Sequence, residues 1–88
     1  MKSRRSKRFR TLLDALPQAV QEQAEEAFHL WQQTPNHPSL HYKPVDPSDP
    51  TVYSARVGRR YRVIGKRQSD GSMLWVWIGS HEDYNKLV

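Results

Sequence analysis

Residues 53–84 read YSARVGRRYRVIGKRQSDGSMLWVWIGSHEDY, and this stretch decides the fold. In its first half, apolar residues alternate with polar or basic ones, which is the period-two pattern of a half-buried strand. Gly58-Arg59-Arg60 and Asp70-Gly71 interrupt the pattern with turn residues. The run MLWVWIG at 73–79 is apolar at odd and even positions alike, so we expect it to be the central strand, buried on both faces. The stretch therefore predicts three consecutive antiparallel strands.

Two amphipathic helices are predicted before these strands. Between Ser6 and Leu16 the apolar residues fall at 9, 12, 13 and 16, which is the spacing of one helix face. From Pro17 to Gln33 the stripe is formed by Val20, Ala24, Ala27, Phe28 and Trp31. Because Pro is well placed at the first position of a helix, Leu16-Pro17 is expected to join the two helices as an antiparallel hairpin.

The remaining segments are shorter. Residues 35–50 hold five of the six prolines and are expected to form a loop that Leu40 and Tyr42 anchor to the core. Residues 1–8 are interpreted as a basic arm or a short edge strand, and Ser80 is expected to cap a final helix from His81 to Leu87. The predicted fold is α+β, with a small antiparallel sheet of three to four strands, an N-terminal helical hairpin and a short C-terminal helix. The 88 residues are expected to form a single domain.

The charge is unevenly distributed along the chain. The formal net charge is +5, with +6 on residues 1–10, −5 on 11–50 and +4 on 51–88. Basic ends indicate a polyanionic partner such as RNA, DNA or an acidic protein, although they also serve solubility. The chain has no cysteine and no apolar run of transmembrane length, so we expect a cytoplasmic protein without disulfides and with no membrane partner.

Arg56 and Arg62 are the first candidate site residues. A three-residue loop at 58–60 places them opposite each other on one sheet face, where two guanidinium groups repel unless an anion lies between them. A two-residue loop shifts the register and separates them. The pair is therefore a candidate phosphate site, and the alternative is two solvated arginines at a sheet edge.

His81 and Tyr84 form the second candidate pair. Their i, i+3 spacing puts them on one face of a helical turn, where a histidine can transfer protons and a tyrosine hydroxyl can donate to a phosphate. On spacing alone, a helix-capping histidine and a packed tyrosine are the better interpretation.

Other chemistries have little support. His37 and His41 lack a third and fourth metal ligand, so no metal and no cofactor is expected. No Gly-rich phosphate loop and no Gly-x-Ser-x-Gly elbow is present, and Ser39, Ser54 and Ser80 lack the context of a nucleophile. Trp75 and Trp77 are expected to share one strand face and to pack in the core rather than to stack on bases.

Taken together, the sequence resembles the RelE/ParE superfamily of bacterial toxins from type II toxin–antitoxin systems. The resemblance rests on Leu16-Pro17 between two helices, NHPSLHYK at 36–43, YSARVGRRYRV at 53–63 and WIGSHEDYNKL at 77–87. It covers nearly the whole chain, and the order and spacing of the motifs are more specific than any motif alone.

The resemblance implies an activity and residues for it. Ribosome-dependent members of the family are endoribonucleases that cleave mRNA without metal and so inhibit translation, and the resemblance favours this activity. The alternatives are an inhibitor of DNA gyrase, as in ParE-type members, or a catalytically inactive relative that binds nucleic acid through its basic arm. By resemblance the catalytic residues are Arg56, Arg62, His81 and Tyr84, with the arginines on the phosphate and the other two in proton transfer. Four further basic residues are predicted to bind nucleic acid, namely Lys43, Arg59, Arg60 and Lys66. The implied partners are a cognate antitoxin with mRNA and the ribosome, or DNA gyrase in the alternative.

Overall fold

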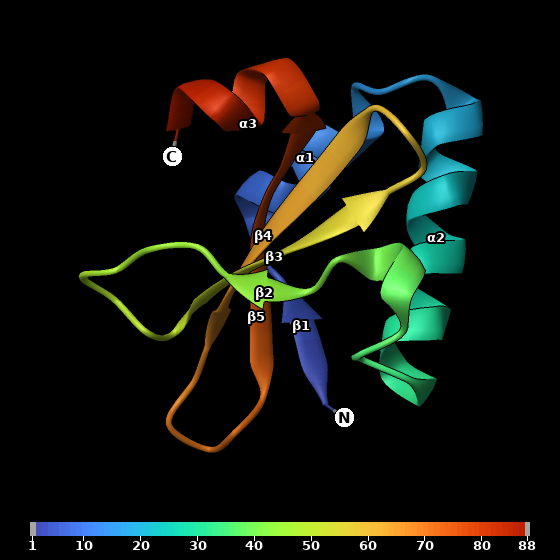
Figure 1. Cartoon of the computed structure of the whole chain (residues 1–88). Helices are drawn as coiled ribbons and strands as arrows, with labels where there is room; N and C mark the ends of the chain where they lie inside the picture. Colours follow the sequence, from blue (N-terminus) through green and yellow to red (C-terminus); the bar gives the residue numbers. More distant parts are fainter. Residues whose placement is uncertain (1, 88) are drawn as a thin grey trace.

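The computed structural model describes residues 2–87 and confirms the predicted α+β class (Figure 1). Its elements, in chain order, are β1 (Ser3–Arg5), α1 (Lys7–Asp14), α2 (Gln18–Gln33), the 3-10 helix η1 (Pro38–Leu40), β2 (Lys43–Pro44), β3 (Val52–Val57), β4 (Tyr61–Arg67), β5 (Met73–Ser80) and α3 (His81–Leu87). No helix in this described range is long and apolar enough to cross a membrane.

One five-stranded sheet organises the molecule, in the order β1-β5-β4-β3-β2. The three predicted strands form β3, β4 and β5, and a short strand is added at each edge. β1 pairs parallel with β5 at Ser3–Arg5, while the other pairings are antiparallel. The N-terminal segment is thus an edge strand from Ser3 to Arg5 rather than an arm. The prediction that residues 73–79 form the central strand is wrong, because β4 occupies the middle and β5 lies second from the edge.

The hairpin between β3 and β4 has a three-residue loop, which is the first of the two alternatives that the sequence left open. Arg56 is opposite Arg62 in the register, and Gly58 takes a left-handed φ of 59°. A Cβ on Gly58 would lie 2.7 Å from Oε1 of Gln23, so both the backbone conformation and the contact with α2 favour glycine here.

A β-bulge in β5 separates the two tryptophans of that strand. Gly65 is opposite Trp75 and Ile64 is opposite Trp77, with a register shift between them. Consecutive residues of β4 face opposite sides of the sheet, so their partners Trp75 and Trp77 do as well. The prediction that these tryptophans share one face is therefore wrong. Because of the extra residue, the core-facing positions of β5 change from odd-numbered Met73 and Trp75 to even-numbered Ile78. Core residues therefore occur at both odd and even positions of 73–79.

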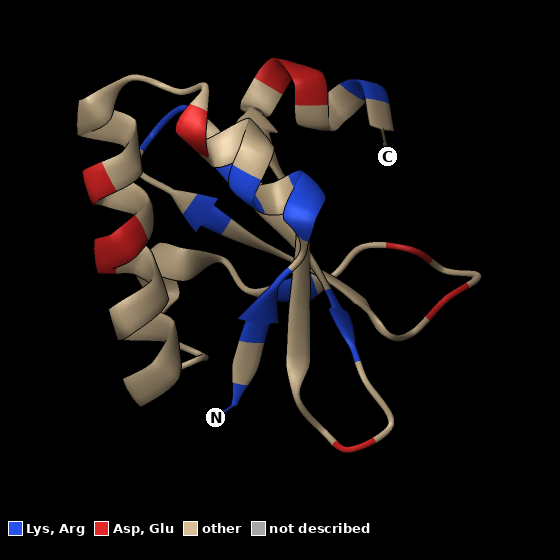
Figure 2. Ribbon diagram, turned by 180° about the vertical axis from the view of Figure 1, so that it is seen from behind, with Lys and Arg blue, Asp and Glu red and all other residues tan. Residues whose placement is uncertain are grey.

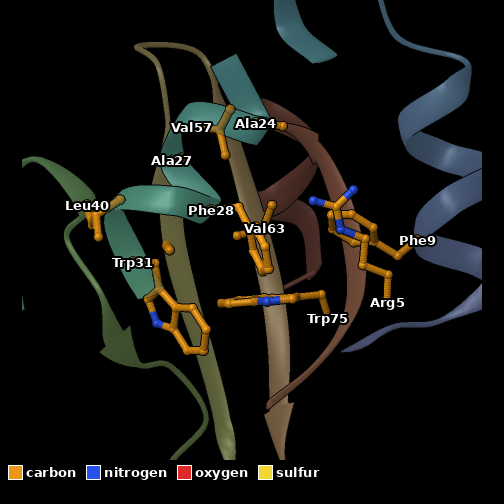
Figure 3. A pocket seen from close by; sticks show the side chains of 11 residues that line it. Arg5, Phe9, Ala24, Ala27, Phe28, Trp31, Leu40, Val57, Val63 and Trp75 are labelled. Atoms are coloured by element: carbon orange, nitrogen blue, oxygen red, sulfur yellow. The ribbon is translucent and has the colours of Figure 1, made fainter. Parts of the chain in front are cut away.

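α1 and α2 pack on the same face of the sheet, and the core lies between them and the strands. Trp31 of α2 is 1% exposed, and its ring centroid lies 5.1 Å from that of Trp75 in an edge-to-face arrangement (Figure 3). Phe9 and Leu13 extend the same core from α1. A cavity of about 30 Å³ remains beside these rings; because its walls are apolar and it has room for about one water, it is not a ligand site.

The proline-rich segment after α2 is anchored as predicted. Leu40 of η1 is buried in the core, and the Tyr42 ring stacks on Tyr53 with centroids 4.9 Å apart. This anchoring brings the backbone of His41 toward the face of the sheet opposite α1 and α2, which we call the second face. Ser54 and Arg62 lie on this face, because their chain neighbours Ala55 and Val63 lie in the core.

Candidate active site

Arg62 is a buried cation on the second face. Its side chain is 5% exposed, and its Nη2 donates to the hydroxyl of Ser54 at 2.7 Å and to the carbonyl of His41 at 3.5 Å. Its Nε is buried with no partner among the described residues. A guanidinium held in this way has N–H donors that the described residues leave unused, Nε among them.

Tyr84 covers Arg62 from α3. Its ring centroid lies 4.8 Å from Cζ of Arg62, and its hydroxyl donates to Ser54 at 3.2 Å. Ser80 positions the helix, because its hydroxyl accepts from the Asp83 N–H at 3.1 Å, as predicted for a cap. Glu82 and Asp83 lie in the first turn, where negative charge stabilises a helix. Tyr84 is the buried residue of α3, so its packing holds the helix to the sheet.

His81 lies at the edge of this cluster and is exposed. Its ring centroid is 5.9 Å from that of Tyr84, and its backbone N–H donates to the Arg60 carbonyl at 2.7 Å. The structure therefore brings together three of the four predicted catalytic residues, Arg62, His81 and Tyr84.

Arg56 is placed differently. Although its backbone is opposite that of Arg62, its Nε donates to the Gly58 carbonyl at 2.9 Å. Its side chain lines a hollow with Gln23 and Glu26 of α2. Arg62 is turned to Ser54 and Arg56 to the 58–60 loop, so no anion between them is needed to relieve repulsion in this conformation.

Comparisons with known proteins identify the family of this chain. The family model described as the ParE-like toxin domain matches residues 18–86. The chain belongs to the ParE-like toxin domain family. A search of curated proteins found no match.

Solved structures share the fold of this ParE-like domain. They include the RelBE2 toxin–antitoxin complex of Mycobacterium tuberculosis, with a TM-score of 0.70 and 21% identity over 91% of this chain and 96% of that one. The RelB–RelE antitoxin–toxin complex of Methanococcus jannaschii has a TM-score of 0.71 and 15% identity, over 94% of this chain and 95% of that one. YafQ of Escherichia coli has a TM-score of 0.73 and 14% identity, over 94% of this chain and 96% of that one. The family match confirms the resemblance to RelE/ParE superfamily toxins, and the solved toxin–antitoxin complexes share the fold.

The four predicted nucleic-acid-binding residues of the ParE-like domain are spread over the molecule. Lys43 is opposite Ser54 in the register, and Arg60 contacts His81 through its carbonyl, so both lie beside the cluster. Arg59 is exposed in the same loop. Lys66 lies at the far end of β4, where its Nζ is 3.5 Å from a carboxylate oxygen of Asp49.

Sequence reasoning missed two members of the site. Ser54 is 0% exposed and accepts hydrogen bonds from both Arg62 and Tyr84, so it links the two side chains. His41 was considered only as a metal ligand, yet it contributes a carbonyl and takes a left-handed φ of 46°. His37, the other histidine of this segment, caps η1 by accepting from the Ser39 N–H at 3.2 Å. A hydroxyl inside a strand of otherwise large or apolar residues was the one available signal for Ser54.

Proposed function

We propose that this ParE-like toxin domain is a metal-independent endoribonuclease that cleaves mRNA on the ribosome. The observation that supports the proposal is the cluster of Arg62, Tyr84 and His81 on one face of the sheet. It combines a cation for a phosphate with two groups able to transfer protons.

The reaction that fits this cluster is attack of a ribose 2′-oxygen on the adjacent phosphorus. The new O–P bond forms as the bond to the 5′-oxygen breaks. The 2′-hydroxyl loses a proton to a base, and the leaving oxygen takes one from an acid. We assign these two transfers to His81 and Tyr84, and stabilisation of the pentavalent phosphate to Arg62 with help from Arg56. The products are a 2′,3′-cyclic phosphate and a 5′-hydroxyl.

Access to Arg62 requires a local rearrangement. Tyr84 lies over the guanidinium, and the two side chains are 6% and 5% exposed. In the proposed reaction Tyr84 turns away from Arg62 when RNA binds, while Ser54 keeps the guanidinium in place.

A cognate antitoxin is the proposed partner in the bacterial cytoplasm. Since the toxin carries a net charge of +5, we propose that the antitoxin presents an acidic, partly disordered segment that folds on binding. The fold neighbours from M. tuberculosis and M. jannaschii are complexes of a toxin with an antitoxin.

A toxin that acts by binding alone, such as an inhibitor of DNA gyrase, is the second candidate. The mutual burial of Arg62 and Tyr84 favours it, because a packed arginine–tyrosine pair stabilises α3 even if no phosphate ever reaches it.

The test is cleavage of a defined mRNA by purified toxin in a translating system, with the ends of the products analysed. We expect cleavage within codons by the wild type and a rate lower by about 10²-fold or more for His81→Ala and Arg62→Ala. His81 is exposed, so His81→Ala leaves the packing intact even if Arg62→Ala unfolds the protein. Lys86→Gln, an exposed change on the same helix, is the matched control and keeps full activity.

Equal cleavage by wild type and His81→Ala would refute the assignment of His81. Intact mRNA together with inhibition of purified DNA gyrase would support the second candidate.

A further inference from the structure

A second cationic surface lies away from the Arg62 cluster, on β1 and the first turns of α1. It consists of Lys2, Arg4, Lys7, Arg8 and Arg10, all exposed, and we call it the β1–α1 surface. Figure 2 shows the basic residues of β1 and α1 gathered on the side that faces the viewer, while α2 carries acidic residues. Two strands separate β1 from β3, and α3 lies at the other end of β5.

These cations are held on ordered backbone. β1 pairs with β5, with Arg4 opposite Leu74, and the Ser6 hydroxyl caps α1 by accepting from the Phe9 N–H at 3.0 Å. The apolar side chains of α1, Phe9 and Leu13, point into the core. The surface therefore presents charge from an ordered scaffold, and its apolar neighbours Phe28 and Leu74 are half-buried.

Among the basic residues of this segment, Arg5 alone has a structural role in the fold. It forms two hydrogen bonds of 2.8 Å with the Glu25 carboxylate, and its guanidinium lies over the Phe9 and Phe28 rings. Within residues 2–87 the five cations of the β1–α1 surface form no ion pair. The nearby acid Asp70 shares a hollow with Lys2 and Arg4, but its carboxylate accepts two bonds from Ser72.

The position of Lys7 and Arg8 works against helix stability. They occupy the first turn of α1, which contains no acid, so their charges oppose the helix dipole. A binding anion reverses this unfavourable interaction, since a helix N-terminus and its cations then face negative charge.

We infer that the β1–α1 surface binds the phosphate backbone of folded RNA, in addition to the RNA proposed to enter the Arg62 cluster. A protein partner would require an apolar, charge-depleted interface centre, which this surface lacks. Single-stranded RNA is usually held by exposed aromatic rings, but Phe9 is buried, and the half-buried Phe28 beside Arg4 and Arg10 has the Arg5 guanidinium over its ring. A surface of five exposed cations without a free aromatic ring fits duplex phosphates, which are contacted without regard to base sequence. This inference goes beyond the proposed function and does not depend on cleavage.

The experiment measures binding of a fluorescently labelled RNA hairpin by anisotropy, over a series of salt concentrations. The wild type should bind with an affinity that falls steeply with salt, and Arg4→Gln, Arg8→Gln and Arg10→Gln should each reduce the log–log slope by about 0.9. The triple variant should lose at least about 10-fold in affinity at low salt. Lys86→Gln removes one exposed cation elsewhere and should leave the slope unchanged.

Three further readouts make the result specific. Arg8→Gln should not lower the melting temperature, because it removes a charge that opposes the helix dipole. The triple substitution should weaken the binding of an oligouridine strand less than it weakens the binding of the hairpin. His81→Ala, a change at an exposed residue of the proposed catalytic site, should bind the hairpin as the wild type does, which separates this surface from that site.

Hairpin binding by the triple variant equal to that of the wild type would overturn the inference. So would loss of hairpin binding in His81→Ala, because the hairpin would then occupy the cluster. Loss of antitoxin binding with intact RNA binding in the triple variant would assign the surface to a protein partner. If the toxin cleaves no RNA at all, the hairpin result still decides the inference.

Discussion

At the scale of single residues, the packing of the site depends on one buried hydroxyl. Ser54 accepts from Arg62 at 2.7 Å and from Tyr84 at 3.2 Å, with 0% of its surface exposed. Within the described chain, the Tyr84 hydroxyl has no other acceptor. Apart from Ser54, the Arg62 side chain donates only to the His41 carbonyl, through a longer hydrogen bond of 3.5 Å. Ser54 thus joins β3, β4 and α3 at one point.

We predict that Ser54→Ala lowers the free energy of unfolding by about 1–3 kcal/mol, because it leaves two buried donors without their shared acceptor. Urea denaturation measures this loss, and hydrogen exchange should show faster exchange in α3, which Tyr84 holds to the sheet. Ser48→Ala is the control, since it removes an exposed hydroxyl in the 45–51 loop and should change stability by less than about 0.5 kcal/mol. An unchanged stability for Ser54→Ala would show that Ser54 does not hold Arg62 and Tyr84.

Residue identity alone predicted parts of the site but not their burial. The turn at 58–60 was readable, but the sequence left its loop at two or three residues, and the structure decides for three and so places Arg56 opposite Arg62. The i, i+3 spacing also placed His81 beside Tyr84. Burial of Arg62 was not readable, because it depends on where α3 and the His41 loop pack against the sheet, and these contacts are far apart in sequence.

At the scale of elements, β1 is joined to α2 by an ion pair that also covers aromatic rings. Arg5 lies over Phe28 and bonds to Glu25, which fixes the edge strand against the helix. The hydrogen bonds from Arg5 hold the pKa of Glu25 below its usual value of 4.5. The Glu25 pKa is thus lower in the folded than in the unfolded chain. Its contribution to stability is present above about pH 4.5 and is lost as the pH falls through the folded value.

We predict that Glu25→Gln makes the protein less sensitive to acid. At neutral pH the substitution should cost no more than about 1 kcal/mol, because both side chains are partly exposed. Melting temperatures at about pH 7 and pH 3 should therefore differ less in Glu25→Gln than in the wild type, since the variant lacks a carboxylate to protonate. Glu22→Gln, an exposed change on α2, should keep the wild-type difference. If the melting temperature of Glu25→Gln fell between about pH 7 and pH 3 by as much as that of the wild type, this explanation of the Arg5–Glu25 pair would be wrong.

The elements themselves differ in how far the sequence predicts them. Both long helices were evident from the spacing of apolar residues, and Pro17 and Thr34-Pro35 marked the ends of α2. β1 carries the sequence Ser-Arg-Arg, which has no apolar strand signal, and it forms through backbone pairing with β5. The bulge in β5 was also hidden, because an apolar run such as 73–79 fits either face in either register.

At the scale of the whole molecule, charge and topology separate three regions. α2 is acidic, the Arg62 cluster lies between the second face and α3, and the β1–α1 surface lies at the opposite edge of the sheet. We propose that the β1–α1 surface binds folded RNA and that an RNA strand binds separately at the Arg62 cluster. The sequence shows the total charge of +5 and the concentration of basic residues at the two chain ends. It does not show that these two basic segments lie on separate surfaces, because this depends on the parallel pairing of β1 with β5.

The central claim is that the Arg62–Tyr84–His81 cluster cleaves mRNA, and the most direct measurement is made in cells. Wild-type toxin and His81→Ala are induced at matched levels in a bacterium, and growth and transcript 5′ ends are followed together. We predict growth arrest with new 5′ ends inside translated codons for the wild type, and neither for His81→Ala. Growth arrest with intact transcripts, or equal cleavage by both proteins, would contradict the account.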